Sequence, residues 1–190
     1  VVGFFGQPAE IPGQEEAFRD LVSALARHSP PALVLLREHP KSPELRTEHL
    51  AALAGAGLAA VDATGADPIE PWLAACDIVA TCFSQCAMDY AFLDAASPEP
   101  LGATLFLLTT HEARAFLRDC SGEAAPDGVA QGLGQVAETA ADVSRLLGSL
   151  LAPEARRRYH DASQRLPRHA DIPRIVETLL GRASARSVTR

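Results

Sequence analysis

Short runs of apolar residues alternate with helical patterns along most of this 190-residue chain. The apolar runs cover residues 1–5, 32–36, 58–61, 77–83 and 101–108. Strands that are apolar along their whole length are typical of a parallel sheet with helices on both faces. The right-handed crossover rule then predicts a doubly wound, Rossmann-like α/β fold with three layers.

Helical spacing of apolar residues separates these runs. We expect helices over residues 14–28, 42–57, 84–95, 110–118 and 138–150, with one or two helical turns at 68–75. Two serines are placed as typical helix starts: Ser42 precedes a proline, and Ser84 directly follows an apolar run. The stretch 121–137 holds four glycines and a proline, and it is predicted to be a loop.

The chain divides into three parts. Residues 1–150 are predicted to form the Rossmann-like domain, residues 151–182 to form C-terminal helices that pack on it, and residues 183–190 to be a frayed tail. One of these helices begins at Pro153 and another covers residues 172–180. The chain begins inside an expected strand and without Met, so we expect an N-terminal half to precede it.

Composition excludes several classes of protein. The net charge of −7 argues against a general nucleic-acid binder. The charge is uneven, about −12 over residues 1–153 and about +5 over 154–190. No apolar run approaches the roughly 18 residues that a membrane span needs, and no secretory signal opens the chain. The four cysteines lack CxxC spacing, which indicates reduced thiols in a cytoplasmic protein.

The expected topology predicts where a ligand would bind. In an open parallel sheet, ligands bind beyond the carboxyl ends of the strands, near the switch in strand order. With the order 3-2-1-4-5, Gln7 and Ser84 face each other across this switch, and His39 lies one strand further out. Asp77 precedes its strand, so we expect it at the opposite edge, where it would connect loops.

Each of these residues has a functional and a purely structural interpretation. Ser84 and the first backbone N–H groups of its helix can form an anion site, or Ser84 can simply cap the helix. His39 is held extended by the following proline and can bind a phosphate oxygen, or it is an ordinary loop histidine. Asp89, five residues after Ser84, can bind both hydroxyls of a ribose, or it is a solvated helical residue. The Arg156–Arg158 stretch is a solvated helix face or a site for a phosphate or a partner.

Several well-known motifs are missing. No G-x-G-x-x-G follows the first apolar run, no P-loop is present, and no G-x-S-x-G surrounds Ser84. These absences argue against a dinucleotide oxidoreductase, a P-loop protein and an α/β-hydrolase. There is no D-x-D and the carboxylates do not cluster, so no metal or cofactor is predicted.

Three segments in order carry a family resemblance: F-F-G-Q-P, R-E-H-P-K-S and A-A-C-D-I-V-A-T-C-F-S-Q-C-A-M-D-Y-A. Together they resemble the C-terminal, donor-binding half of GT-B glycosyltransferases. The resemblance is to bacterial sialyltransferases, capsule polysaccharide transferases and CDP-polyol phosphotransferases, and it covers roughly residues 1–150. Those families carry a His-Pro motif after the second strand and a D-x-x-x-T-x-x-S-x-x-x-x-E-like motif on the fourth strand and its helix. Asp77, Thr81, Ser84 and Asp89 match the second motif.

The resemblance implies a function. This half would bind a CMP- or UDP-activated nucleotide-sugar, whose sugar passes to a hydroxyl acceptor in cell-surface polysaccharide or glycan synthesis. His39 and Ser84 would contact the donor phosphate and Asp89 the ribose, and the expected donor-binding set is completed by Gln7 and Gln85. The general base would come from the missing half, so this segment alone is expected to be inactive. Any peripheral membrane association would come only through the full-length protein.

Two alternatives stay open at this point. One is a CDP-polyol phosphotransferase, which uses a similar donor. The other is a non-catalytic Rossmann-like module that binds a partner or has a regulatory role.

Overall fold

The computed structural model describes residues 1–167 and contains a six-stranded parallel sheet. The strands are β1 (Val2–Phe5), β2 (Val34–Arg37), β3 (Ala60–Asp62), β4 (Ile78–Thr81), β5 (Ala103–Leu107) and β6 (Gly134–Ala137). Their order is β3-β2-β1-β4-β5-β6, so the order reverses between β1 and β4. The predicted strand order is confirmed, and β6 extends it by one strand.

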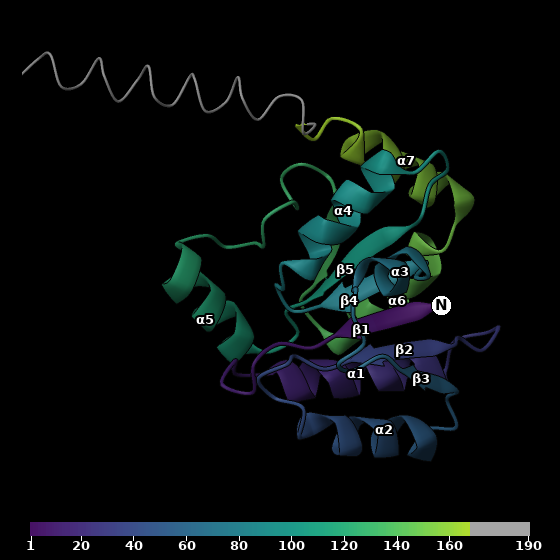
Figure 1. The fold of residues 1–190 in the computed structure, drawn as a ribbon. Coiled ribbons are helices and arrows are strands. Elements are labelled where there is room, and N and C mark those ends of the chain that lie inside the picture. The colour runs from purple at the N-terminus through teal and green to yellow at the C-terminus, as the bar shows by residue number, and fades with distance from the viewer. Residues whose placement is uncertain (168–190) are drawn as a thin grey trace, which may run out of the picture.

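Helices cover both faces of this sheet. They are α1 (Gln14–Ala26), α2 (Leu45–Gly55), α3 (Glu70–Ala74), α4 (Cys86–Ala96), α5 (His111–Ser121), α6 (Ala140–Leu150) and α7 (Pro153–Ser163). One face packs against α1, α2 and α6, and the other against α3 and α4. Figure 1 shows these layers, with α5 standing apart on the side where the strands end. The three-layer, doubly wound fold is therefore confirmed.

Alternate side chains of each strand enter different cores. Val2 and Phe4 of β1 pack in the core that contains α1 and α6, whereas Phe5 packs with Val79 in the core under α4. Both sets are almost completely buried. Burial on both faces explains why these strands are apolar along their whole length.

The prediction of a loop over residues 121–137 is wrong at its end, where β6 pairs with β5. Within the described residues β6 pairs with β5 alone, so it lies at the edge of the sheet, and Gln135 is only half-buried. Its glycines and polar residues concealed a strand, because an edge strand needs fewer apolar side chains than a central one.

Two predicted helix starts also change. Helix α2 begins at Leu45, and the Ser42 hydroxyl instead accepts a hydrogen bond from the N–H of Ala9, at 2.7 Å. Helix α4 begins at Cys86 with Gln85 as its N-cap residue, so Ser84 lies one residue before the cap. The predicted helix at 172–180 and the tail at 183–190 lie outside the described residues.

Candidate functional site

The switch between β1 and β4 is held by polar contacts that continue past the ends of both strands. The Thr81 hydroxyl donates to the carbonyl of Phe5 at 2.9 Å, and the N–H of Phe83 donates to Gln7 Oε1 at 3.0 Å. Gln14 fixes Gln7 from the other side, because its amide bonds both the N–H and the carbonyl of Gln7. Gln7 therefore lies buried across the switch, next to the residue that precedes Ser84.

The segment between β4 and α4 presents unpaired donors at the same edge. The Ser84 hydroxyl accepts a hydrogen bond from the N–H of Cys86 at 3.3 Å. Within the described part of the chain, the backbone N–H groups of Ser84 and Gln85 have no hydrogen-bond partner. Free N–H groups at the start of an 11-residue helix attract anions, because the helix dipole adds to their partial positive charge.

A pocket of about 200 Å³ opens beside this segment. It lies between the start of α4, the helix α5 and the loop that follows α5. Its lining residues are Phe83, Ser84, Gln85, Ala87, Met88, Phe106, Leu117, Cys120, Ser121, Ala125, Pro126 and Asp127. The pocket lining thus combines aromatic and apolar side chains with a few polar ones, which is typical of small-molecule sites.

Two broader hollows, of about 590 and 580 Å³, lie elsewhere. One is lined by the start of β6 and by α7, and the other by the start of β1 and by Asp77. Both are at the amino edge of the sheet, where no predicted donor-binding residue lies. The smaller pocket is the better candidate because ligands of open parallel sheets bind at the carboxyl edge.

His39 follows β2 and is half-buried. Its Nδ1 accepts a hydrogen bond from the N–H of Lys41 at 3.1 Å. An accepting Nδ1 places the proton of the neutral ring on Nε2, which makes Nε2–H a donor. Since β1 lies between β2 and β4, the strands that precede His39 and Ser84 are two strand spacings apart, or about 10 Å.

Asp89 lies on a different side of α4. It is not among the residues that line the 200 Å³ pocket. Burial raises the pKa of Asp89, and the nearby carboxylate of Glu70 raises it further. Asp89 thus lies near the start of α3. A ribose bound by Asp89 would therefore lie outside the 200 Å³ pocket.

The other two positions of the predicted motif have structural contacts. Thr81 is fully buried and its hydroxyl is used in the bond to Phe5. Asp77 lies at the amino edge and pairs with Arg156 of α7 at 2.8 Å. The expected position of Asp77 at the opposite edge of the sheet is confirmed, but Asp77 pairs with the N-terminal amine and with helix α7 and not with a loop. Arg156 is the residue of the Arg156–Arg158 stretch that makes the contact with α7.

Sequence reasoning overlooked two charged residues at the end of β2. Arg37 is buried and donates to the carbonyl of Ala63 at 3.0 Å and to Asp67 at 3.0 Å, so it orders the segment after β3. Glu38 is buried below the loop that carries Gly6. The signal was present in the sequence, since an Arg-Glu pair directly after a buried apolar strand must find partners or remain exposed.

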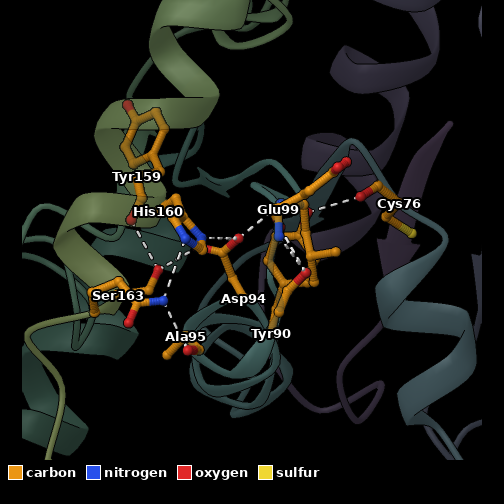
Figure 2. Close-up of polar contacts among 11 residues, drawn as sticks. Cys76, Tyr90, Asp94, Ala95, Glu99, Tyr159, His160 and Ser163 are labelled. Carbon is orange, nitrogen blue, oxygen red and sulfur yellow. Dashed lines mark hydrogen bonds and ion pairs between the residues drawn. The ribbon is translucent and has the colours of Figure 1, made fainter.

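A second polar cluster joins α4 to α7 (Figure 2). Asp94 of α4 accepts hydrogen bonds from Ser163 at 2.6 Å, from His160 at 3.2 Å and from the N–H of Leu101 at 2.8 Å. Ser, His and Asp are the residues of a hydrolase triad, but here the serine contacts the carboxylate and not the histidine. This cluster cannot activate the serine as a nucleophile through the histidine, and it fixes the position of α7.

The described residues include no cluster of three or more His, Cys, Asp or Glu side chains arranged to hold a metal ion. No helix in the same part of the chain is long and apolar enough to cross a membrane. All four cysteines are free thiols. Burial raises the pKa of Cys76 and of Cys82 to about 12, so both stay protonated at neutral pH.

No protein-family model matches the sequence, and no curated protein sequence matches it. Solved structures do match. The wall teichoic acid polymerase TagF, soaked with CDPG, superposes with a TM-score of 0.59 at 13% identity, over 100% of this chain and 43% of that chain. The UDP-GlcNAc 2-epimerase of Neisseria meningitidis, bound to UDP-GlcNAc, gives 0.55 at 17% identity, over 95% of this chain and 44% of that chain.

A third match is a single domain. The C-terminal domain of LpcC, a group 1 family glycosyl transferase of Francisella tularensis, gives a TM-score of 0.52 at 18% identity, over 86% of this chain and 81% of that chain. The chain therefore has the fold of the C-terminal domain of GT-B proteins. It spans less than half the length of TagF and of the epimerase.

Proposed function

We propose that this chain is the nucleotide-sugar-binding half of a glycosyltransferase that uses a CMP- or UDP-activated donor. The observation that carries the proposal is the meeting of three kinds of donor at one edge of the sheet. These are the Nε2–H of His39, the hydroxyl of Ser84, and the free backbone N–H groups of Ser84 and Gln85, next to Gln7 at the switch. All belong to segments that follow the carboxyl ends of strands, where ligands of this fold class bind.

The geometry suggests how a nucleotide would lie. The pocket walls formed by Phe83 and Phe106 suit the flat face of a base. The phosphates would then lie between the start of α4 and His39. Phosphates that span from the end of β4 to the end of β2 would cross two strand spacings, about 10 Å, which exceeds one phosphate and favours a diphosphate. Asp89 is proposed to bind the ribose.

In such a site the protein acts electrostatically on the leaving phosphate. Oriented N–H groups and the imidazole stabilise the negative charge that develops as the bond to the sugar breaks. The base that removes the acceptor proton would come from a separate acceptor-binding domain, in agreement with the partial coverage of TagF. We propose that the protein works in the cytoplasm, in cell-surface polysaccharide or glycan synthesis.

A second candidate is a CDP-polyol phosphotransferase. The observation that favours it is the match to TagF over the whole of this chain, in a structure soaked with CDPG. The two candidates share a nucleotide site and differ in the group that is transferred. MnaA of S. aureus, solved with UDP, superposes with a TM-score of 0.52 at 15% identity, so related folds also hold UDP.

Calorimetric titration of this chain with CMP, CDP and UDP tests the proposal. We expect CDP or UDP to bind more tightly than CMP. His39→Ala and Ser84→Ala should each weaken binding about 10-fold, the loss of one hydrogen bond to a charged group. Equal affinities for CMP and CDP would instead favour a CMP-activated donor.

Matched controls are available at the other edge and on the outer surface. His28→Ala, at the amino edge, and Ser149→Ala, on the exposed side of α6, should leave the affinity unchanged. If none of the three nucleotides binds at millimolar concentration, the donor site is disproved and a non-catalytic module becomes the better interpretation.

A further inference from the structure

Glu38 is a buried carboxylate that lies against Gly6 and directly precedes His39 in the chain. It follows β2, its side chain is completely inaccessible to solvent, and its Oε1 lies 2.6 Å from Nδ1 of His49 on α2. The His49 ring stacks on Phe18 of α1 at 3.9 Å between centroids and meets the edge of Phe4. Aromatic rings therefore flank the histidine, and among the described residues His49 is the side chain that hydrogen-bonds this carboxylate.

The second oxygen of Glu38 is unpartnered. Among the described residues no donor lies within hydrogen-bond distance of Oε2. This oxygen instead lies against Gly6, where an added Cβ would come within 2.5 Å of it. A half-paired buried carboxylate is unfavourable for stability, so it calls for an explanation beyond folding.

The two loops above Glu38 are joined to each other. The N–H of Ala9 in the β1–α1 loop donates to the Ser42 hydroxyl in the β2–α2 loop at 2.7 Å. The first of these loops begins at Gly6 and carries Gln7, and the second begins with His39. Glu38 contacts the start of the first loop and is the residue before the second, so a shift of its side chain would move both.

We propose that Glu38, held by His49, is a positioning residue for the donor phosphates. The carboxylate packs against Gly6, whose N–H donates to the carbonyl of Arg37 at 2.9 Å, and thereby supports the start of both loops and the position of the Nε2–H donor of His39. This role rests on the proposed function, and it assigns part of the binding affinity to a residue that does not contact the ligand.

Glu38→Gln tests the role because it keeps the size of the side chain and removes its charge. We expect the affinity for CDP or UDP to fall about 10-fold, while the urea midpoint of unfolding stays at or above the wild-type value. A residue with only a structural role would lower the midpoint and leave the affinity of the folded protein unchanged. Glu48→Gln, on the exposed face of α2, is the matched control and should change neither.

Two further measurements separate positioning from direct binding. In a His39→Ala background, Glu38→Gln should cause no additional loss of affinity, because it acts through His39. His49→Asn, which keeps a donor near the position of Nδ1, should retain more affinity than His49→Leu. Losses from Glu38→Gln and His39→Ala that simply add, or wild-type affinity in Glu38→Gln, would overturn the proposal.

A ligand-free measurement distinguishes this proposal from the proposed function. In ¹⁵N spectra, Glu38→Gln should shift the amide signals of Ala9 and Ser42, which join the two loops and do not contact Glu38, and Glu48→Gln should not shift them. If the wild-type chain binds none of the nucleotides but these signals shift, the proposed function fails while the control of loop position by Glu38 stands. If the signals do not shift, the positioning role fails whatever the nucleotides do.

Discussion

Two buried carboxylate–histidine pairs in this molecule differ in how many hydrogen-bond partners surround the carboxylate. Asp94 joins α4 to α7 and accepts hydrogen bonds from Ser163, His160 and the N–H of Leu101. Glu38, at the carboxyl edge of the sheet, contacts His49 with one oxygen and leaves the other unpartnered within the described residues. The two pairs are chemically alike, so their difference comes from what the fold places around them.

This difference indicates different roles. A buried carboxylate whose oxygens are all paired repays part of its desolvation cost, and it stabilises the packing of the elements that it joins. A half-paired carboxylate such as Glu38 offsets less of its desolvation cost. Glu38 lies next to the two loops of the proposed donor site. Local rules are most often broken at functional sites, and the position of Glu38 agrees with that general pattern.

The largest effect is expected from removing the fully paired carboxylate. Asp94→Ala leaves His160 and the N–H of Leu101 without this acceptor, and leaves the Ser163 hydroxyl with the carbonyl of Tyr159 alone. We expect a loss of about 3–5 kcal/mol in the free energy of unfolding, measured by urea denaturation. Asp119→Ala, on the exposed face of α5, is the control and should change stability by less than about 0.5 kcal/mol. A loss below about 1 kcal/mol for Asp94→Ala would contradict a stabilising role for the cluster.

Alanine substitutions at two glycines near these pairs should lower stability by less than Asp94→Ala, and by different amounts. A Cβ at Gly102 would collide with the backbone carbonyl of Asp77 and come within 2.7 Å of the Tyr90 hydroxyl, whereas one at Gly6 would meet the end of the Glu38 side chain. Backbone cannot move aside as a side chain can. We expect Gly102→Ala to lose about 2–3 kcal/mol of stability and Gly6→Ala about 1 kcal/mol or less.

The same two variants should have the reverse order in nucleotide binding. Gly6→Ala pushes on the loop of the proposed site, so its affinity for UDP or CDP should fall, while Gly102→Ala should bind as wild type once folded. Thermal melts measure the stability of each variant, and calorimetric titration at one temperature measures its affinity for UDP or CDP. Equal losses of affinity in the two variants would show that the Gly6 region has no special connection to binding.

The smallest effect concerns Asp89, a half-buried carboxylate whose side chain has no hydrogen bond or ion pair among residues 1–167. Burial and Glu70 raise its pKa above the ordinary 3.8, so folding favours its protonated form. Its ionisation therefore lowers stability as pH rises through and above that value. Asp89→Asn should melt at a slightly higher temperature than wild type at pH 7, and the difference should vanish below about pH 3.8. A difference that persists at low pH would point to a packing effect.

Much of the fold could be predicted from the sequence because it depends on local patterns. The apolar run at residues 1–5 and the run at 77–83 mark strands that are buried on both faces, and the helical spacing between such runs requires crossovers. Together these features place β1 and β4 at the switch in strand order. The positions of Gln7, His39 and Ser84 at the carboxyl edge followed from that topology.

Other features depended on contacts between distant segments. The strand β6 forms because its backbone pairs with the edge of β5, although the composition of residues 121–137 is that of a loop. Ser42 carries the signature of a helix cap, but the tertiary structure uses its hydroxyl to bind the N–H of Ala9. Propensity was overridden in both places by a partner far away in the sequence.

The sequence by itself determined the doubly wound sheet and the edge at which a ligand would bind, because periodicity and chain order are local properties. Only the tertiary structure decided which charged residues are paired. Asp94 meets Ser163 of α7 across 69 positions of sequence, and Glu38 meets His49 but leaves one oxygen free below Gly6. The energy of a buried charge depends on every group around it, and those groups come together only when the chain has folded.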